Sequence, residues 1–463
     1  MMKSLLLNAF DMMVPVHQSP GLWRHPESRI SQFDTLPYWT SLAETLEQGR
    51  FSALFLADVL GVYDVYGASA ETAYRGGLQY PLLDPLSAVS AMADHTRHLG
   101  FGVTASVSYE HPFLLARRLS SLDHLTGGRL AWNIVTSYQD SSAKNMGLAQ
   151  QIPHDQRYDR ADEYMEVMYR LFEASLEVGA VRNDAETGVV VDPDRVHPAN
   201  HRGEFFTVPG SALTHPGPQR TPLLFQAGAS PRGRQFALDH AEAVFLIGAT
   251  PELVRHWVDE LRDGLEARGR DRHAVKIFAM ATVVTGTSDA DATARWESYR
   301  QFVDTEAALA LFGGWTGVDL AAANPEDTLE YVTTDANRSA LEAMTTLAES
   351  TGGSAYTVKD LAEFVALGGR GPVLVGSGDT VAEELRRWAT TADIDGFNIS
   401  AAVRPADLER FATFVTPALA ERGLLSSPQP GDAPRTLREQ YFNAGPHTAA
   451  DHRASSYRPA PRS

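Results

Sequence analysis

Eight short apolar segments, separated by amphipathic or polar stretches, constrain the fold of this chain more than any other feature of its sequence. Short apolar runs predict buried strands, and apolar residues spaced by three and four predict helices. Strands that alternate with helices imply parallel pairing with right-handed crossovers, and eight such strands match an α/β fold, the (β/α)8 TIM barrel. The expected strands are residues 4–10, 51–57, 100–107, 130–136, 223–226, 243–247, 275–285 and 396–400.

Two polar regions and a tail fall outside this alternation. Residues 177–222 are polar and rich in proline, and we predict that they form an insertion carrying short hairpins. Residues 313–355 form a second irregular region. We therefore predict a single barrel domain over residues 1–425 with these two insertions. The tail, residues 426–463, is rich in Pro, Ala, Arg and Ser without periodicity, which predicts an extended or disordered C-terminal arm.

The composition excludes several classes of function. The formal net charge of −18 argues against a nucleic-acid partner or an anionic membrane surface, because both require a basic footprint. The chain has no cysteine, which excludes disulfides and thiolate chemistry and fits a reducing compartment, so we expect the cytoplasm. No segment approaches about 18 continuous apolar residues, so no membrane span is expected. No metal is expected either, because His17, His25, His111 and His154 lack a helical metal-ligand spacing.

The stretch 154–163, His-Asp-Gln-Arg-Tyr-Asp-Arg-Ala-Asp-Glu, follows the fourth expected strand and a polar loop. It predicts a helix start, because apolar residues recur at helical spacing and acidic side chains crowd the first turns, where the helix dipole favours them. His154 and Tyr158 are four residues apart, so they point the same way at the mouth of a strand–helix unit. The alternative is a surface or capping histidine followed by a core tyrosine.

Residues 227–233, Ala-Gly-Ala-Ser-Pro-Arg-Gly, place small residues at the end of the fifth strand and before a helix start. Gly228, Ser230, the nearby Arg232 and the N–H groups of a helix N-terminus make a seat for phosphate. The alternative is a plain helix cap, in which serine precedes a proline at the first helical position. Both interpretations can hold together.

Other polar side chains end neighbouring strands, where barrels carry their active sites. Asp58 ends the second strand or caps the following turn. Thr104 and Ser106 lie on the third strand, and Ser137 follows the fourth. The chain has no Gly-x-Ser-x-Gly elbow, which disfavours a serine hydrolase, and no glycine-rich phosphate loop of a nucleotide-binding type.

Taken together, these segments resemble the bacterial-luciferase-like flavin monooxygenases. More narrowly, the chain is similar to the branch that contains nitrilotriacetate monooxygenase component A, dibenzothiophene-sulfone monooxygenase and long-chain alkane monooxygenase. The resemblance covers roughly residues 4–422. It is carried by Leu-Ala-Asp at 56–58, Thr-Ala-Ser at 104–106, Gly-Gly-Arg-Leu-Ala-Trp-Asn-Ile-Val-Thr-Ser at 127–137, His-Asp-Gln-Arg-Tyr at 154–158, Gln-Ala-Gly-Ala-Ser-Pro-Arg-Gly at 226–233 and Asp-Gly-Phe at 395–397.

The resemblance implies a TIM barrel of the bacterial luciferase type that binds reduced FMN, supplied by a separate NAD(P)H:flavin reductase. Oxygen, O2, would add to the flavin and give a peroxyflavin that oxygenates a small organic substrate. A homodimer or homotetramer is also implied. The cofactor-binding residues carried over by the family pattern are Asp58, Thr104, Ser106 and Ser137 at the isoalloxazine ring, and His154, Tyr158, Gly228 and Ser230 at the ribityl chain and phosphate.

The substrate side of the site is less defined. The alkane enzyme's pattern has a histidine where this chain has Tyr138, so a histidine acid–base role is not carried over and the catalytic acid or base is unassigned. Amines, sulfones, alkanes and natural-product precursors all fit the fold. The irregular regions 61–80, 177–222 and 313–354 are candidate lids, because a reactive flavin needs protection from water. Candidate substrate contacts are Phe10, His17, Trp23, Tyr63, Tyr109 and Tyr138, each of which could instead be core or lid packing.

Three other functions fit a barrel of this type. A deazaflavin-dependent hydride-transfer oxidoreductase is disfavoured by the monooxygenase-like segments, and oxygen consumption with reduced FMN would discriminate the two. A non-catalytic flavin-binding protein is disfavoured by the long irregular regions, which favour an enclosed site. A sugar or phosphate enzyme would lack the combination of Asp58 with His154 and Tyr158.

Overall fold

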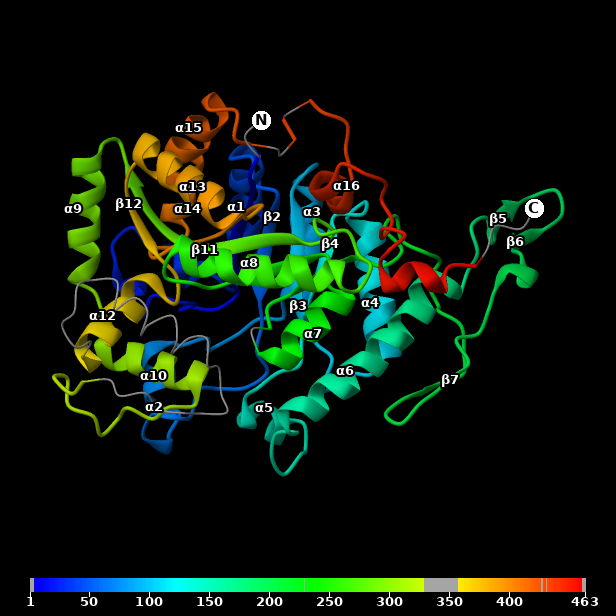
Figure 1. The fold of residues 1–463 in the computed structure, drawn as a ribbon, viewed down its shortest axis with the longest axis horizontal. Helices are drawn as coiled ribbons and strands as arrows, with labels where there is room; N and C mark the ends of the chain where they lie inside the picture. Colours follow the sequence, from blue (N-terminus) through cyan, green and yellow to red (C-terminus); the bar gives the residue numbers. More distant parts are fainter. Residues whose placement is uncertain (1–3, 229, 329–356, 426–427, 430, 460–463) are drawn as a thin grey trace.

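A closed barrel of eight parallel strands forms the centre of the molecule, with helices around it (Figure 1). The computed structural model describes residues 4–228, 230–328, 357–425, 428–429 and 431–459. The barrel closes because β10 pairs with β11 as well as with β9. The predicted (β/α)8 barrel is therefore confirmed. Around the barrel, the strands follow in the order β1 (Leu6–Met12), β2 (Ala53–Ala57), β3 (Gly100–Ser106), β4 (Leu130–Val135), β9 (Leu223–Gln226), β10 (Ala243–Leu246), β11 (Lys276–Gly286) and β13 (Gly396–Ser400).

A further strand, β12 (Val373–Ser377), lies outside the barrel, and the sequence analysis missed it. It pairs with the carboxyl-terminal part of β11, from Thr282 to Gly286, whereas β13 pairs with the preceding part of the same strand. At 11 residues, β11 is long enough to pair with both β12 and β13. A strand of five residues between glycine-containing turns has too little periodicity to be distinguished from a loop.

The helices form the outer layer of the barrel. Residues 289–311 lie in two helices, because Asp304 starts a new one by accepting a hydrogen bond from the N–H of Ala307. Residues 85–94 form a 3₁₀ turn followed by a short helix. No helix in the described part of the chain is long and apolar enough to cross a bilayer. The helices are α1 (Leu36–Gln48), α2 (Glu71–Gly76), α3 (Val89–Asp94), α4 (Pro112–Leu125), α5 (Asp140–Asn145), α6 (His154–Tyr169), α7 (Pro231–His240), α8 (Pro251–Glu266), α9 (Asp289–Arg300), α10 (Thr305–Thr316), α12 (Val358–Gly368), α13 (Gly378–Ala392), α14 (Ala406–Arg410), α15 (Thr416–Glu421) and α16 (Leu437–Phe442).

Aromatic side chains fill the interior of the barrel. The ring of Phe10 lies 5.5 Å from that of Phe55 and 5.2 Å from that of Phe245, and the rings of Phe225 and Phe278 are 5.8 Å apart. These pairs are packed edge to face or tilted, the arrangements that aromatic rings prefer. The interior is a solid core, so polar chemistry is confined to the carboxyl-terminal mouth of the barrel.

Residues 177–222 form two short hairpins, β5 (Val181–Asp184) with β6 (Val189–Val191) and β7 (His201–Arg202) with β8 (Thr207–Val208). The region projects from the side of the barrel at the right of Figure 1. Glu163, within α6, accepts hydrogen bonds from the backbone N–H groups of Phe205 at 2.9 Å and Phe206 at 2.8 Å. The insertion therefore packs on the outside of α6 and not over the mouth, so the expectation that it is a lid is wrong.

An apolar cluster, which we call the cover, joins chain segments that follow β1, β2 and β11. It contains Val16, residues from the 61–80 loop with α2, and the helices α10 and α12. Tyr63 lies against α10 so closely that a Cβ on Gly314 would be 2.1 Å from its ring. Because its segments leave the carboxyl ends of strands, the cover lies on the mouth side of the barrel. Of the second predicted insertion, residues 313–316 belong to α10, and residues 329–355 lie outside the described residues.

The C-terminal segment docks against the barrel, so the expectation of an extended or disordered arm is wrong for its described residues. Thr436 and Glu439 form a capping box that starts α16. Leu437 is fully buried and Tyr441 is 4 % exposed, and both belong to the aromatic cluster of the barrel interior. The Tyr441 hydroxyl donates a hydrogen bond to Asn8, on β1, at 2.7 Å. This helix therefore contributes side chains to the core.

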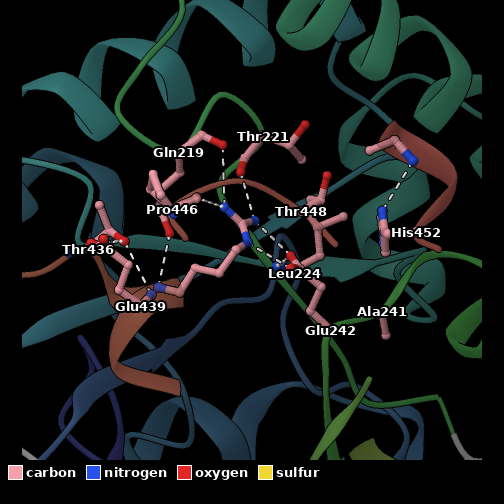
Figure 2. Close-up of polar contacts among 12 residues, drawn as sticks. Gln219, Thr221, Leu224, Ala241, Glu242, Thr436, Glu439, Pro446, Thr448 and His452 are labelled. Carbon is pink, nitrogen blue, oxygen red and sulfur yellow. Dashed lines mark hydrogen bonds and ion pairs between the residues drawn. The ribbon is translucent and has the colours of Figure 1, made fainter. Parts of the chain in front are cut away.

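A buried ion pair anchors the same helix. The guanidinium of Arg438, 2 % exposed, donates to both carboxylate oxygens of Glu242 at 2.7 and 2.8 Å. Figure 2 shows Glu242 and the polar groups that surround this pair. The carbonyls of Thr221 and Pro446 accept hydrogen bonds from the same guanidinium at 2.9 and 2.7 Å. The composition of the tail did not reveal this contact, because it joins residues 196 positions apart.

Candidate active site at the barrel mouth

Tyr158 lies in the first turn of α6, and its hydroxyl reaches the turn between β9 and α7. A Cβ on Gly228 would lie 2.8 Å from that hydroxyl, and a Cβ on Gly233 would lie 2.7 Å from it. Ser230 caps α7 by accepting a hydrogen bond from the N–H of Gly233 at 3.0 Å. The structure thus brings Tyr158, Gly228 and Ser230 together at a helix N-terminus, an arrangement that suits an anion such as phosphate.

Arg157 is a cation beside this cradle, and the sequence analysis overlooked it. Its side chain is buried, and its Nε has no hydrogen-bond acceptor among the residues that the structure describes. Burial lowers its pKa, and the groups that oppose this shift are the hydroxyls of Tyr158 and Tyr109 and not a carboxylate. By contrast, Arg232, which we expected at a phosphate seat, is neutralised by two aspartates of α6, at 3.0 and 2.6 Å. Arg157 therefore carries the uncompensated positive charge of the cradle.

His154 lies at the rim of the same cradle. Its ring centre is 5.2 Å from that of Tyr158, as the spacing of four residues predicted. Its side chain is 38 % exposed, and its Nδ1 lies 2.7 Å from the carboxylate of Asp155. It can therefore reach a group bound at the cradle from the solvent side.

Polar side chains also line the ends of β3 and β4. Alternate residues of β3 pack outward into the core, so Thr104 and Ser106 point into the barrel. The amide of Asn133 donates to the Thr104 hydroxyl at 2.9 Å, and the hydroxyls of Ser106 and Ser137 are 2.8 Å apart. The Oδ1 of Asn133 is buried without a donor. An unsatisfied buried acceptor of this kind suits a ligand N–H.

Asp58 follows β2 and is largely buried. Burial and, to a smaller extent, the charge of Asp84 together raise its pKa from 3.8 to about 7, although a hydrogen bond from the N–H of Val59 opposes the shift. A carboxyl group with this pKa carries its proton for part of the time at neutral pH, so it can donate as well as accept a hydrogen bond.

The candidate substrate contacts fall into two groups. The Tyr63 and Tyr138 hydroxyls are 2.9 Å apart, and Tyr63 donates to the Oε1 of Gln79 at 2.8 Å. The ring of Phe10 lies 4.7 Å from that of His17, whose carbonyl accepts from the Nε2 of Gln79 at 3.2 Å. Burial lowers the pKa of His17 well below its ordinary value, so this imidazole is neutral. Gln79 joins the two groups, although it does not stand out in the sequence.

The remaining candidates are Trp23, which lines a pocket together with His17 and Gln18, and Tyr109. Trp23 is 47 % exposed in a short 3₁₀ turn. Tyr109 accepts a hydrogen bond from the Nε2 of Gln151 at 2.7 Å and lies nearer to Arg157 than to the tyrosine pair. In the part of the chain that the structure describes, no group of three or more His, Asp or Glu side chains could hold a metal ion.

The closed barrel and the polar groups at its mouth define an α/β-barrel enzyme. The chain belongs to the luciferase-like monooxygenase family, whose model matches residues 9–393. The resemblance found in the sequence is thus confirmed. The dibenzothiophene-sulfone monooxygenase of Rhodococcus erythropolis, from the branch named above, is 36 % identical over 92 % of this chain and 93 % of its own length.

Two other curated relatives match nearly the whole chain. The dimethyl-sulfide monooxygenase of Hyphomicrobium sulfonivorans is 46 % identical over 99 % of this chain and 95 % of its own length. The long-chain alkane monooxygenase of Geobacillus thermodenitrificans is 42 % identical over 99 % of both chains.

Solved structures agree with this assignment. The crystal structure of DmoA from Hyphomicrobium sulfonivorans has a TM-score of 0.91 at 46 % identity and covers 98 % of this chain and 96 % of that chain. The structure of riboflavin lyase RcaE, solved with modified FMN and riboflavin, has a TM-score of 0.88 at 34 % identity and covers 99 % of this chain and 100 % of that chain.

Proposed function

We propose that this chain is the oxygenase component of a two-component monooxygenase that uses reduced FMN and O2 to oxygenate a small organic substrate. The family match supports the monooxygenase class. The flavin assignment rests on one observation, the uncompensated cation Arg157 next to Tyr158, Gly228 and Ser230 at a helix N-terminus. The relatives are named for dimethyl sulfide, long-chain alkanes and an aromatic sulfone, so the proposed substrate class stays broad.

The residues at the mouth fit FMN in charge and in hydrogen-bonding capacity. A phosphate would compensate Arg157 and accept from the hydroxyls of Tyr158 and Ser230. A flavin ring N–H would satisfy the buried Oδ1 of Asn133, which lacks a donor. The structure of riboflavin lyase, on the same fold, was solved with a modified FMN, which supports a flavin as a ligand of this fold.

The chemistry divides between cofactor and protein. Reduced FMN, when bound, supplies two electrons, and O2 supplies one oxygen atom to the substrate while its second atom leaves as water. The protein's part is to bind, to orient and to exclude water. In this proposal Thr104, Ser106 and Ser137 orient the ring, and the cover keeps bulk water from the mouth. Asp58 would hold a proton at the ring edge, because its pKa is about 7.

The proposal includes partners. A separate NAD(P)H:flavin reductase would supply the reduced FMN. We expect the oxygenase to assemble as a homodimer or homotetramer. The absence of cysteine fits a reducing compartment such as the cytoplasm.

Anaerobic titration with reduced FMN tests the cofactor site. We expect the wild-type chain to bind, and we expect Tyr158→Phe and Ser230→Ala each to weaken binding by about 1–3 kcal/mol, the range for lost hydrogen bonds to charged groups. Arg157→Met should weaken it at least as much, because it removes the compensating charge. Tyr74→Phe and Arg117→Met are matched controls on exposed side chains and should bind as the wild type does.

Two results would contradict the proposal. Unchanged affinity in all three cradle variants would remove the phosphate assignment. Binding of reduced FMN without formation of an oxygenated product, when a flavin reductase, NADH, O2 and both neutral and anionic candidate substrates are present, would favour a non-catalytic flavin-binding protein.

A further inference from the structure

Arg370 lies in the glycine-containing turn between α12 and β12, on the substrate side of the mouth. Its guanidinium carbon is 4.6 Å from the centre of the Trp315 ring on α10, close enough for a cation–π contact. Burial raises the pKa of both Tyr63 and Tyr138, and the positive charge of Arg370 opposes that rise. The same charge adds to the effect of burial in lowering the pKa of His17. Arg370 is therefore the cation that the two groups of candidate substrate contacts share.

No acceptor neutralises this guanidinium among the residues that the structure describes. Its Nε is buried without a hydrogen-bond partner. Burial lowers its pKa, and the opposing groups are the hydroxyls of Tyr138 and Tyr63 and not a carboxylate. Arginine stays protonated in proteins, so the charge remains. The Arg370 residue as a whole is only partly buried, so part of it is open to solvent.

The side chains of Gln79, Tyr63 and Tyr138 already donate their hydrogen bonds to other groups of the protein. The Nε2 of Gln79 donates to the carbonyl of His17, which leaves its Oε1 as an acceptor for the Tyr63 hydroxyl. Because Tyr63 donates to Gln79, the Tyr138 hydroxyl is the donor in the 2.9 Å contact between the two tyrosines. Among the described residues, Arg370 is therefore the charged group at this place with donors to offer an incoming ligand.

The geometry favours a particular ligand chemistry. The guanidinium carbon of Arg370 lies over the Trp315 ring, and the N–H groups lie along the edge of the planar guanidinium. That edge matches the paired oxygens of a carboxylate or sulfonate, which it binds with two parallel hydrogen bonds. An uncompensated cation in a partly buried site costs stability, so a ligand that supplies the missing charge binds with a large gain.

We propose that Arg370 binds an anionic oxygen group of the substrate, a carboxylate or a sulfonate, and so selects anionic substrates over neutral or cationic ones of the same length. That the bound ligand is the substrate rests on the proposed monooxygenase function. The oxyanion site itself rests on Arg370 and its neighbours alone.

The test compares probes of one length and different charge. The full chain is titrated calorimetrically, with and without reduced FMN under anaerobic conditions, against alkanesulfonates, alkanoates, 1-alkanols and 1-alkylammonium ions of two to eight carbons. We expect the wild type to bind sulfonates or alkanoates more tightly than alkanols and ammonium ions. Arg370→Met and Arg370→Gln should weaken oxyanion binding at least ten-fold, whereas Arg370→Lys, which keeps the charge, should lose less. Arg300→Met, at an exposed arginine of α9 that is paired with glutamates, is the matched control.

The outcomes distinguish a failure of the oxyanion site at Arg370 from a failure of the proposed monooxygenase function. Equal oxyanion affinity in the wild type and in folded Arg370→Met or Arg370→Gln would overturn the oxyanion site, and so would a preference of the wild type for alkanols at every length. A better binding of sulfonates than of alkanoates, or the reverse, would identify which oxyanion the site takes. If oxyanions bind through Arg370 but reduced FMN does not bind, the oxyanion site stands and the proposed monooxygenase function fails.

Discussion

Arg157 and Arg370 differ from Arg404 and Arg438 in what compensates their charge among the described residues. Arg438 has the carboxylate of Glu242, and Arg404 has that of Asp11. Arg157 and Arg370 each have a buried Nε without an acceptor, and each lies among tyrosine hydroxyls. A buried charge normally has a partner, so an unpaired one in a cleft marks a place where a ligand supplies the partner. At the scale of single residues, the two cations mark the two ends of the proposed site.

The pKa of Asp58 predicts a pH-dependent contribution to stability. The value is raised to about 7 in the folded chain, above the ordinary 3.8, so the folded state holds a proton that the unfolded state has lost. The free energy of unfolding therefore falls as pH rises from about 4 to 7. Asp58→Asn removes this penalty. We expect its melting temperature to rise relative to that of the wild type across this window and to stay higher above pH 7.

Thermal denaturation of the protein without flavin, at intervals between pH 4 and 8, measures this difference. The control is Asp34→Asn, at an exposed aspartate, which should track the wild type. A difference between Asp58→Asn and the wild type that is the same at every pH would contradict the raised pKa.

At the scale of elements, α16 closes the barrel at the end opposite to the site. Its Leu437 and Tyr441 pack with Phe225 and Phe278, and the rings of Tyr441 and Phe278 are 5.6 Å apart. A segment far along the chain thus supplies part of the core on which β9 and β11 rest. The cradle at the barrel mouth depends on this support, because Gly228 and Ser230 follow β9.

The anchor of α16 can be tested through its ion pair. Arg438→Met leaves Glu242 buried and unpaired, so we expect a loss of about 3–5 kcal/mol in the free energy of unfolding. The double variant Arg438→Met with Glu242→Leu should recover much of that loss, since it removes both charges. Urea denaturation measures each value. Arg422→Met, at a surface ion pair with Asp379, should change stability by less than about 1 kcal/mol. A loss as small as that in Arg438→Met would show that α16 is not anchored by this pair.

At the scale of the whole molecule, exposed leucines lie on α4 and on the insertion formed by residues 177–222. Leu125 is 67 % exposed and Leu213 is 68 % exposed. The Leu213 segment runs beside α4, because the rings of His124 and His215 lie 4.0 Å apart. Exposed apolar side chains that gather on one side of a protein are typical of an interface.

We therefore expect this side to contact a second copy of the chain. Sedimentation equilibrium should give two or four times the chain mass of 50.5 kDa. Leu125→Glu combined with Leu213→Glu should lower the mass toward that of one chain, while a glutamate at the exposed Leu36, on α1, should not. A wild-type protein that sediments at 50.5 kDa would contradict the expected assembly.

The barrel and the local parts of the cradle could be predicted from the amino-acid sequence. Strand number follows from short apolar runs, and each run is local. The approach of His154 to Tyr158 follows from helical spacing, and the cap at Ser230 follows from Ser-Pro at a helix start. Such features depend on neighbours within a few positions, so a linear pattern contains them.

The contacts between residues far apart in the sequence could be found only in the folded structure. Whether an arginine has a carboxylate partner depends on chain segments far away, and for this reason Arg157 and Arg370 did not stand out in the sequence. Docking of α16 depends on Glu242, and pairing of β12 depends on the unusual length of β11. These contacts depend on packing and charge across the folded molecule, so the composition and periodicity near each residue do not predict them.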